Sequence, residues 1–216
     1  MSDLARRILV FFFIFTVLGC CTEEPPITNE APASQTAEQG PLSAILETEK
    51  GDIKLELHTE DAPRLSANFV NLVQREFFNG LDFYRSSTVM RQTGNPWNTE
   101  AATYNPGYRL LPEFSPNLDF SKGGMVGCVL FADNNLADVR PTEFFLTVKP
   151  QDRWTFKYPI FGSISDGMDV VRSLQDGDVI RKIRLEGDPT PLLRQQADMV
   201  SDWNAKLDAN PPGTRP

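Results

Sequence analysis

The sequence is poor in the residues that bind metals or act as nucleophiles. It has one histidine and three cysteines among 216 residues. This excludes His-rich metal sites and the usual Ser/His/Asp or Cys/His catalytic arrangements, unless His58 itself is the base. His58 lies in an alternating, strand-like run, which favours a half-exposed polar position. We therefore expect no metal ion and no cofactor.

The sequence also has no dense Lys/Arg cluster beyond its N-terminus. There are 21 basic against 29 acidic residues, a formal net charge of −8. Nucleic-acid binding depends mainly on basic side chains that neutralise phosphates. We therefore expect no nucleic acid as a partner.

A transmembrane-length apolar run is missing as well. The run from Ile8 to Leu18 has eleven residues, whereas a spanning helix needs about 20. With Arg6 and Arg7 before it, the run is typical of a secretory signal. It ends in Val-Leu-Gly-Cys20, which resembles the lipobox of bacterial lipoproteins. The resemblance implies a signal peptide over residues 1–19 and a lipid on Cys20. The alternative is an uncleaved apolar anchor, which would still leave the domain facing outward or lying at the membrane.

Residues 20–41 form the predicted lipidated N-terminus and linker. Residues 22–41 contain four prolines, four glutamates, no aromatic residue and one isoleucine, too little apolar surface for folding. As a coil these 20 residues would span roughly 25 Å. We expect a lipid-anchored protein of the cell envelope that faces the periplasm or the exterior. The outer membrane is favoured in a Gram-negative cell because Cys21 is not the aspartate that resembles an inner-membrane retention signal.

The globular part begins at Leu42 with strand patterns. Runs at 42–49 and 53–58 flank Lys-Gly-Asp, which predicts a hairpin. Asp61 and Pro63 predict the cap and first turn of a helix. Its apolar face includes Leu65 and Phe69, Asn71 falls off that face, and Asn79-Gly80 ends the element. Further strands are expected at 81–84, 89–92, 124–131, 143–148, 159–164 and 179–186, with a short helix at 169–174. Cys128, the single cysteine of this part, is expected to be buried in a strand.

Many short strands with one early helix indicate a mostly β protein. We expect a closed antiparallel barrel capped by helices over residues 42–187. Residues 188–216 form a predicted helical extension, with an amphipathic helix over 190–209. Its apolar stripe contains Leu193, Ala197, Val200 and Leu207, with Trp203 nearby.

Four ordered motifs carry a family resemblance. Residues 62–85, APRLSANFVNLVQREFFNGLDFYR, resemble the cyclophilin segment in which a proline-led helix precedes a Phe-His-Arg strand. MRQTGNP at 90–96 resembles Met-x-Gln-Gly-Gly-Asp-Pro. EFFL at 143–146 resembles Gln-Phe-Phe-Ile, and FGSISDGMDVV at 161–171 is similar to the family's glycine-methionine segment. The resemblance implies a cyclophilin-like barrel and peptidyl-prolyl cis/trans isomerase activity on proline-containing polypeptides.

The resemblance also implies the site residues. Arg85 takes the place of the catalytic arginine and Gln92 that of the glutamine beside it. Substrate-binding positions fall on Met90, Val89, Glu143, Phe145, Trp154 and Tyr158.

Three of these positions depart from the family pattern, and we expect reduced activity from them. Val89 stands where a pocket phenylalanine is usual, and Tyr158 stands near a pocket histidine. Glu143 replaces a glutamine, and its carboxylate could hold Arg85 in an ion pair and compete with the substrate. Tyr84 replaces a histidine, and the family's Met-Ala-Asn strand end has no clear counterpart.

Three functions stay open. The first is an isomerase that assists folding of extracytoplasmic proteins, expected to be monomeric. The second is a proline-peptide-binding or chaperone module with weak catalysis, favoured by Val89 and Glu143. The third is a structural envelope lipoprotein that binds partners through its C-terminal helix. Deleting residues 188–216 should abolish partner binding only in the third case.

Overall fold

The computed structural model describes residues 40–100, 104–131 and 138–213, which belong to one compact unit. The predicted signal peptide, Cys20 and nearly all of the linker lie outside these residues. Within the described ranges, no helix has the length and apolar character needed to cross a membrane.

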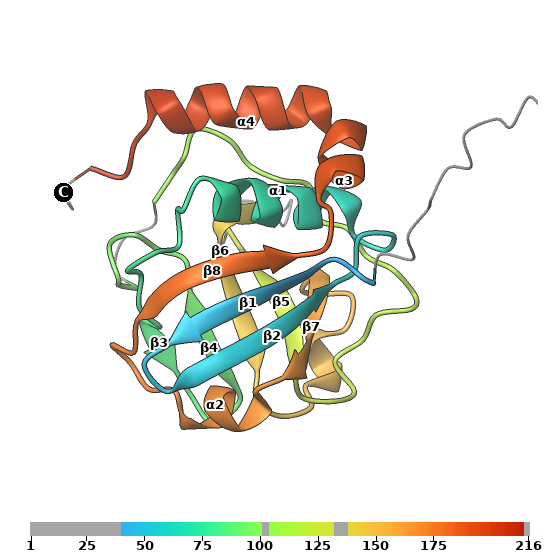
Figure 1. The fold of residues 1–216 in the computed structure, drawn as a ribbon. Coiled ribbons are helices and arrows are strands. Elements are labelled where there is room, and N and C mark those ends of the chain that lie inside the picture. The colour runs from blue at the N-terminus through green and yellow to red at the C-terminus, as the bar shows by residue number, and fades with distance from the viewer. Residues whose placement is uncertain (1–39, 101–103, 132–137, 214–216) are drawn as a thin grey trace, which may run out of the picture. The chain divides into compact units, whose positions relative to one another are not determined.

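Within the described residues, eight antiparallel strands form one sheet, which confirms the mostly β class. The strand order is β3-β4-β6-β5-β7-β2-β1-β8. Figure 1 shows β8, β1 and β2 crossing in front of β5 and β6. The strands are β1 (Ser43–Thr48), β2 (Gly51–Leu57), β3 (Arg85–Ser86), β4 (Met90–Thr93), β5 (Met125–Leu130), β6 (Val139–Thr147), β7 (Ile160–Asp166) and β8 (Ile180–Glu186).

The edge strands β3 and β8 do not pair with each other in the described sheet. Backbone hydrogen bonds join the segment before β3 to the segment before β8 and to the first residue of β8. Phe83 N donates to Asp178 O at 2.9 Å, and Ile180 N donates to Leu81 O at 2.8 Å. The predicted strand at 81–84 is therefore wrong in its extent, because this stretch makes a single bridge at Asp82 before β3 begins. Closure as a regular barrel stays a prediction.

The first hairpin is confirmed. Strands β1 and β2 pair with Thr48 opposite Gly51. Gly51 has a φ of 128°, a left-handed conformation that glycine adopts without a Cβ clash. In β2, Ile53, Leu55 and Leu57 are buried and alternate with more exposed residues. The apolar period of two in the sequence therefore marks the face that the sheet turns inward.

The early helix is α1 (Pro63–Gln74), but Asp61 does not cap it. The N-cap residue is Ala62, and Asp61 instead accepts hydrogen bonds from Ser115 Oγ at 2.5 Å and Asn117 Nδ2 at 2.9 Å. The free N–H of Leu65 donates to the carboxylate of Glu113 at 2.9 Å. A carboxylate distant in sequence thus caps the helix and interacts favourably with its dipole.

The C-terminal extension packs on α1 as two helices. They are α3 (Thr190–Gln195) and α4 (Ala197–Ala209), where the sequence predicted one helix. Figure 1 shows α4 lying across the outer side of α1. Trp203 and Leu207 are buried in the main core, whereas Ala197 of the predicted stripe is exposed.

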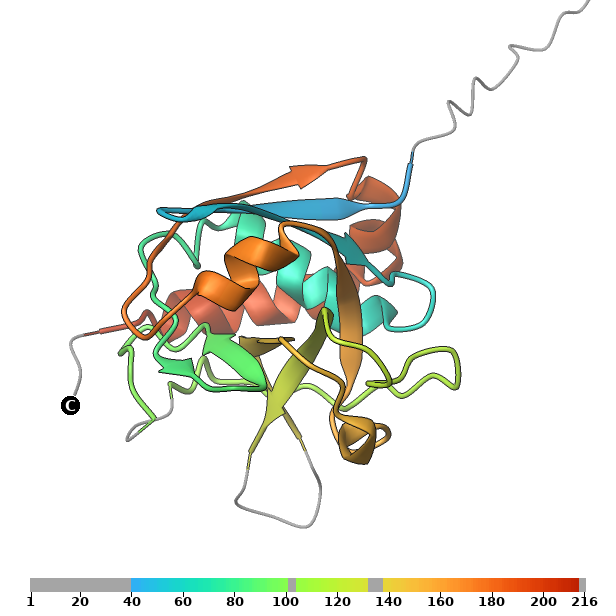
Figure 2. The same ribbon diagram turned by 90° about the horizontal axis from the view of Figure 1, so that it is seen from below.

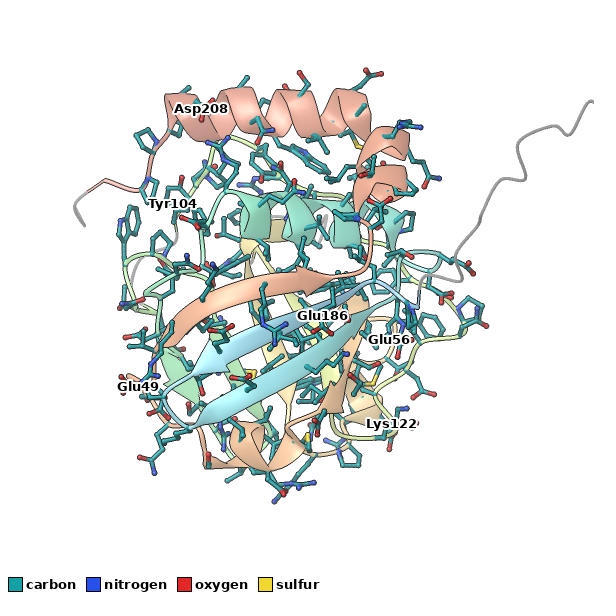
Figure 3. The ribbon with its side chains drawn as sticks, viewed as in Figure 1. Glu49, Glu56, Tyr104, Lys122, Glu186 and Asp208 are labelled. Carbon is teal, nitrogen blue, oxygen red and sulfur yellow. The ribbon has the colours of Figure 1, made fainter. Side chains whose placement is uncertain are left out.

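Polar contacts between the two helices explain the burial of a residue outside the apolar stripe of α1. Asn71 falls off the apolar stripe of α1, yet it is buried, because α4 covers it and Asn204 Oδ1 accepts a 3.0 Å hydrogen bond from its amide. Arg75 pairs with Asp208. Figure 3 shows Asp208 at the C-terminal end of α4, with Tyr104 below it.

Most buried apolar side chains in the described part of the chain belong to one of two clusters. The larger one lies between the sheet and the helices and contains Cys128, as predicted. The smaller one comprises Met90, Phe120, Met125, Phe145 and Ile160. Two short helices complete the described fold, η1 (Asp152–Trp154) and α2 (Met168–Ser173), and in Figure 2 both lie below β1, with α2 nearer to it than η1. The smaller cluster forms the base of the candidate site.

Candidate active site

A cavity of about 480 Å³ opens beside β3, β4 and the end of β5. This size suits a few residues of an extended peptide. Its lining combines aromatic and aliphatic side chains with two arginines. The lining residues are Tyr84, Arg85, Met90, Gln92, Glu100, Val129, Leu130, Phe131, Arg140, Phe145, Trp154 and Tyr158.

Aromatic rings make the apolar wall. Phe145 meets Trp154 and Tyr158 edge-on, with centroid distances of 5.5 and 5.7 Å, and Trp154 meets Tyr158 at 5.5 Å. Phe120 stacks behind Phe145 at 6.0 Å. Each ring is held by its neighbours, so the wall is preformed for a small apolar ring.

Gly127 permits Phe145 to take its place. The two residues are paired between β5 and β6, and a Cβ on Gly127 would lie 2.4 Å from the Phe145 ring. We predict that Gly127→Ala displaces the ring, lowers the free energy of unfolding by about 1–3 kcal/mol and weakens the binding of ligands to the cavity. Urea denaturation and ligand titration measure these two effects. Gly213→Ala is the control, since nothing lies within 4 Å of its added Cβ. Equal behaviour of the two variants would contradict this packing role.

Arg85 places a positively charged guanidinium on the wall of the cavity. It pairs with Gln92 across β3 and β4 and is 46% exposed at its side chain. Its Nη1 donates to Gln92 Oε1 at 3.4 Å, and its Nε lies 3.3 Å from Glu100 Oε2. The guanidinium is therefore oriented by two partners and still accessible to a ligand in the cavity.

The structure corrects the expected partner of Glu143. Its carboxylate is fully buried and faces Arg140, whose Nη1 lies 3.1 Å from Oε2 and 3.2 Å from Oε1. Arg85 pairs with Glu100 instead. Arg140 neutralises Glu143, since a buried charge needs a close and well-bonded counter-charge. The sequence suggested that Glu143 competes with the substrate for Arg85. In the structure, the carboxylate that can do so is the exposed Glu100.

Tyr84 and Gln92 link this buried pair to Arg85. The Tyr84 hydroxyl donates to Glu143 Oε2 at 2.5 Å and accepts a hydrogen bond from Gln92 Nε2. Burial, and then the nearby Glu143 charge, raises the pKa of Tyr84 well above its ordinary value. The hydroxyl therefore stays protonated at neutral pH. The chain of contacts from Arg140 through Glu143, Tyr84 and Gln92 fixes the amide that faces Arg85.

The structure brings most of the sequence-predicted residues together. Arg85, Gln92, Met90, Phe145, Trp154 and Tyr158 all line the cavity. Val89 packs against the smaller apolar cluster, and Glu143 lies beneath the cavity. Six further residues line the cavity that the motifs did not indicate as binding positions: Tyr84, Glu100, Val129, Leu130, Phe131 and Arg140. Arg140, three residues before an unexpected Glu143, was a detectable signal of an ion pair.

Such a site suits a protein that binds an apolar ring and places a hydrogen-bond donor beside it. Among the described residues no group of three or more His, Cys, Asp and Glu side chains could hold a metal ion. Residues 43–192 match the family model described as "Cyclophilin type peptidyl-prolyl cis-trans isomerase/CLD". The chain belongs to this family of enzymes.

Individual relatives agree with this membership. The chain is 33% identical over 172 residues to peptidyl-prolyl cis-trans isomerase 10 of Caenorhabditis elegans, covering 79% of this chain and 98% of that protein. It is 36% identical over 148 residues to a peptidyl-prolyl cis-trans isomerase of Synechococcus elongatus, covering 67% and 97%. The fold is similar, with a TM-score of 0.60 and 19% identity, to a Cryptosporidium parvum cyclophilin crystallised in the presence of the dipeptide Ala-Pro, covering 68% and 99%.

Proposed function

We propose that this isomerase assists the folding of extracytoplasmic polypeptides and that Arg85 is its catalytic donor. Rotation about an X-Pro bond faces a barrier of about 18–20 kcal/mol because the planar amide is resonance-stabilised. Uncatalysed exchange takes tens to hundreds of seconds and can limit folding. A catalyst that lowers this barrier would speed the slow step of a newly exported chain.

The proposed mechanism needs no bond to break. The proline ring enters the aromatic pocket of Phe145, Trp154 and Tyr158. In the twisted state the prolyl nitrogen loses its amide resonance and becomes a better acceptor. Arg85 donates to that nitrogen, an interaction stronger in the twisted state than in the planar one. Gln92, fixed by Tyr84 and Glu143, orients the guanidinium.

The observation that carries this proposal is the half-exposed Arg85 guanidinium on the wall of an aromatic cavity. The pairing of Glu143 with Arg140 removes one argument for the weak binding module, since that carboxylate does not occupy Arg85, and the Glu100 that pairs with Arg85 instead is exposed. Burial of Trp203 and Leu207 against the domain argues against a structural lipoprotein that binds through this helix.

The test is cis/trans exchange of an Ala-Pro peptide, followed by NMR. We expect the protein to accelerate exchange well above the uncatalysed rate at catalytic concentration. Exchange at the uncatalysed rate would rule out the catalytic proposal. Peptide chemical-shift changes on titration would then distinguish a proline-binding module from a scaffold without a site.

We further propose that Cys20 carries a lipid and places the domain at the cell envelope, on the outer membrane in a Gram-negative cell. The support is the short apolar run and the Val-Leu-Gly-Cys sequence. Expression of the full chain in a Gram-negative bacterium with radiolabelled palmitate should give a labelled membrane protein. Cys20→Ser should lose the label, and the neighbouring Cys21→Ser should keep it. Label retained by Cys20→Ser would refute the anchor.

A further inference from the structure

Two aromatic side chains lie exposed and in contact outside the cavity. Phe156 is 60% exposed and Phe114 is 44% exposed. Their ring centroids are 6.4 Å apart in an edge-on arrangement. Single exposed apolar residues are common, but two rings paired in solvent form a small apolar surface able to receive a third apolar group. We call Phe114 and Phe156 the aromatic pair.

The loop that carries Phe114 is fixed on both sides. Glu113 caps α1 through Leu65 N at 2.9 Å, and Ser115 Oγ donates to Asp61 at 2.5 Å. Asn117 donates to the same Asp61 oxygen at 2.9 Å. Phe114 therefore sits between two anchored residues. Its exposed ring is presented by a rigid loop and not by a free chain end.

Phe156 is presented at the cost of an unfavourable backbone. Its φ of 57° lies in the left-handed region, which bulky side chains rarely adopt. Backbone hydrogen bonds to Trp154 O, from Lys157 N at 2.9 Å and Tyr158 N at 3.0 Å, hold the turn in this form. Strain of this kind persists where surrounding contacts enforce it, and it gathers at binding sites.

The turn joins the aromatic pair to the cavity. Trp154 and Tyr158, two residues on either side of Phe156, both line the cavity and contact each other at 5.5 Å. Thr155 Oγ1 accepts a hydrogen bond from Phe120 N at 3.1 Å, which ties the turn to the cluster behind the pocket. One rigid turn thus displays two rings toward the cavity and one ring toward Phe114.

We propose that the aromatic pair is a second subsite for the same substrate chain. It would bind a large apolar side chain a few residues from the proline that occupies the cavity. This inference rests on the proposed function, because its occupant is the isomerase's own substrate. Large apolar side chains are mostly buried in folded proteins and exposed in unfolded chains, so the subsite favours unfolded polypeptides.

The test uses the full chain, purified in mild detergent, and a set of long peptides with one central Ala-Pro. In each peptide a single phenylalanine replaces serine at one position up to six residues from the proline. At its best position we expect phenylalanine to raise kcat/KM about tenfold, a magnitude consistent with partial burial of an aromatic ring. Phe156→Asn should abolish this preference, since asparagine tolerates the left-handed backbone and the variant therefore folds.

Three comparisons decide the outcome. Phe114→Ser should also lose the preference, while Leu111→Asn, which removes an exposed apolar side chain outside the aromatic pair, should keep it. Exchange of a short Ala-Pro peptide should be equal in all four proteins. If the parent fails on the short peptide, the proposed function fails. If it catalyses that exchange but shows no phenylalanine preference that depends on Phe156, only the subsite is refuted.

Discussion

Replacing Arg85 with alanine is expected to lower kcat/KM for X-Pro exchange by about 10²–10³-fold, the loss typical of a donor that acts mainly in the transition state. The aromatic wall does not depend on Arg85, so peptide binding should change much less than the rate. NMR exchange of an Ala-Pro peptide and a peptide titration measure the two quantities.

Two further variants distinguish the hydrogen-bond geometry of Arg85 from its positive charge. Arg85→Lys keeps the positive charge but loses the planar fork that faces Gln92 and the cavity, so we expect little recovery of the rate. Arg181→Ala removes another exposed arginine, paired with Glu49 at 3.6 Å, and should behave like the parent. If the Arg85→Ala protein is fully active, Arg85 is not the catalytic donor.

Breaking the buried Arg140–Glu143 pair should give the largest loss of stability. The Glu143 side chain is 0% exposed and that of Arg140 is 21% exposed. Arg140→Leu leaves the carboxylate buried without its counter-charge, and we expect a loss of about 3–5 kcal/mol in the free energy of unfolding. Urea denaturation followed by circular dichroism measures it.

The matched double variant tests the cause of that loss. Arg140→Leu combined with Glu143→Gln removes both charges and should recover most of the stability. Arg172→Ala breaks an exposed pair with Asp169 and should cost less than about 1 kcal/mol. If the double variant is as unstable as Arg140→Leu, lost packing and not the unpaired charge explains the effect.

Local sequence patterns were enough to predict the strands and helices that bury one regular face of apolar residues. The alternation of Ile53, Leu55 and Leu57 identified β2, and the helical spacing of Leu65 and Phe69 identified α1. Both patterns reflect one buried face of one element. Motif order then placed Arg85 and Gln92, and the structure pairs them across neighbouring strands.

Local patterns did not predict the partners of several polar side chains, most of which are distant in sequence. Asn71 falls off the apolar face of α1, and its spacing did not indicate that α4, more than 120 residues later, covers it. Asp61 looked like a helix cap, but Ser115 and Asn117 engage it, while Glu113 satisfies the helix. Glu143 looked like a competitor for Arg85 until Arg140 was seen beside it. Polar side chains have several possible partners, and only tertiary structure selects among them.

The pairing of β1 with β8 bears on how the chain can fold as it is made. Residues 43–48 at the start of the domain hydrogen-bond to residues 180–186 near its end. Contacts between residues so far apart in sequence form late, and they lower the folding rate. Because the N-terminal end of the chain is made first, one edge of β1 stays unpaired until β8 has been made. The domain therefore reaches its native sheet only after synthesis or transport has delivered nearly its whole length, and until then it has the same exposed edges as the chains it would assist.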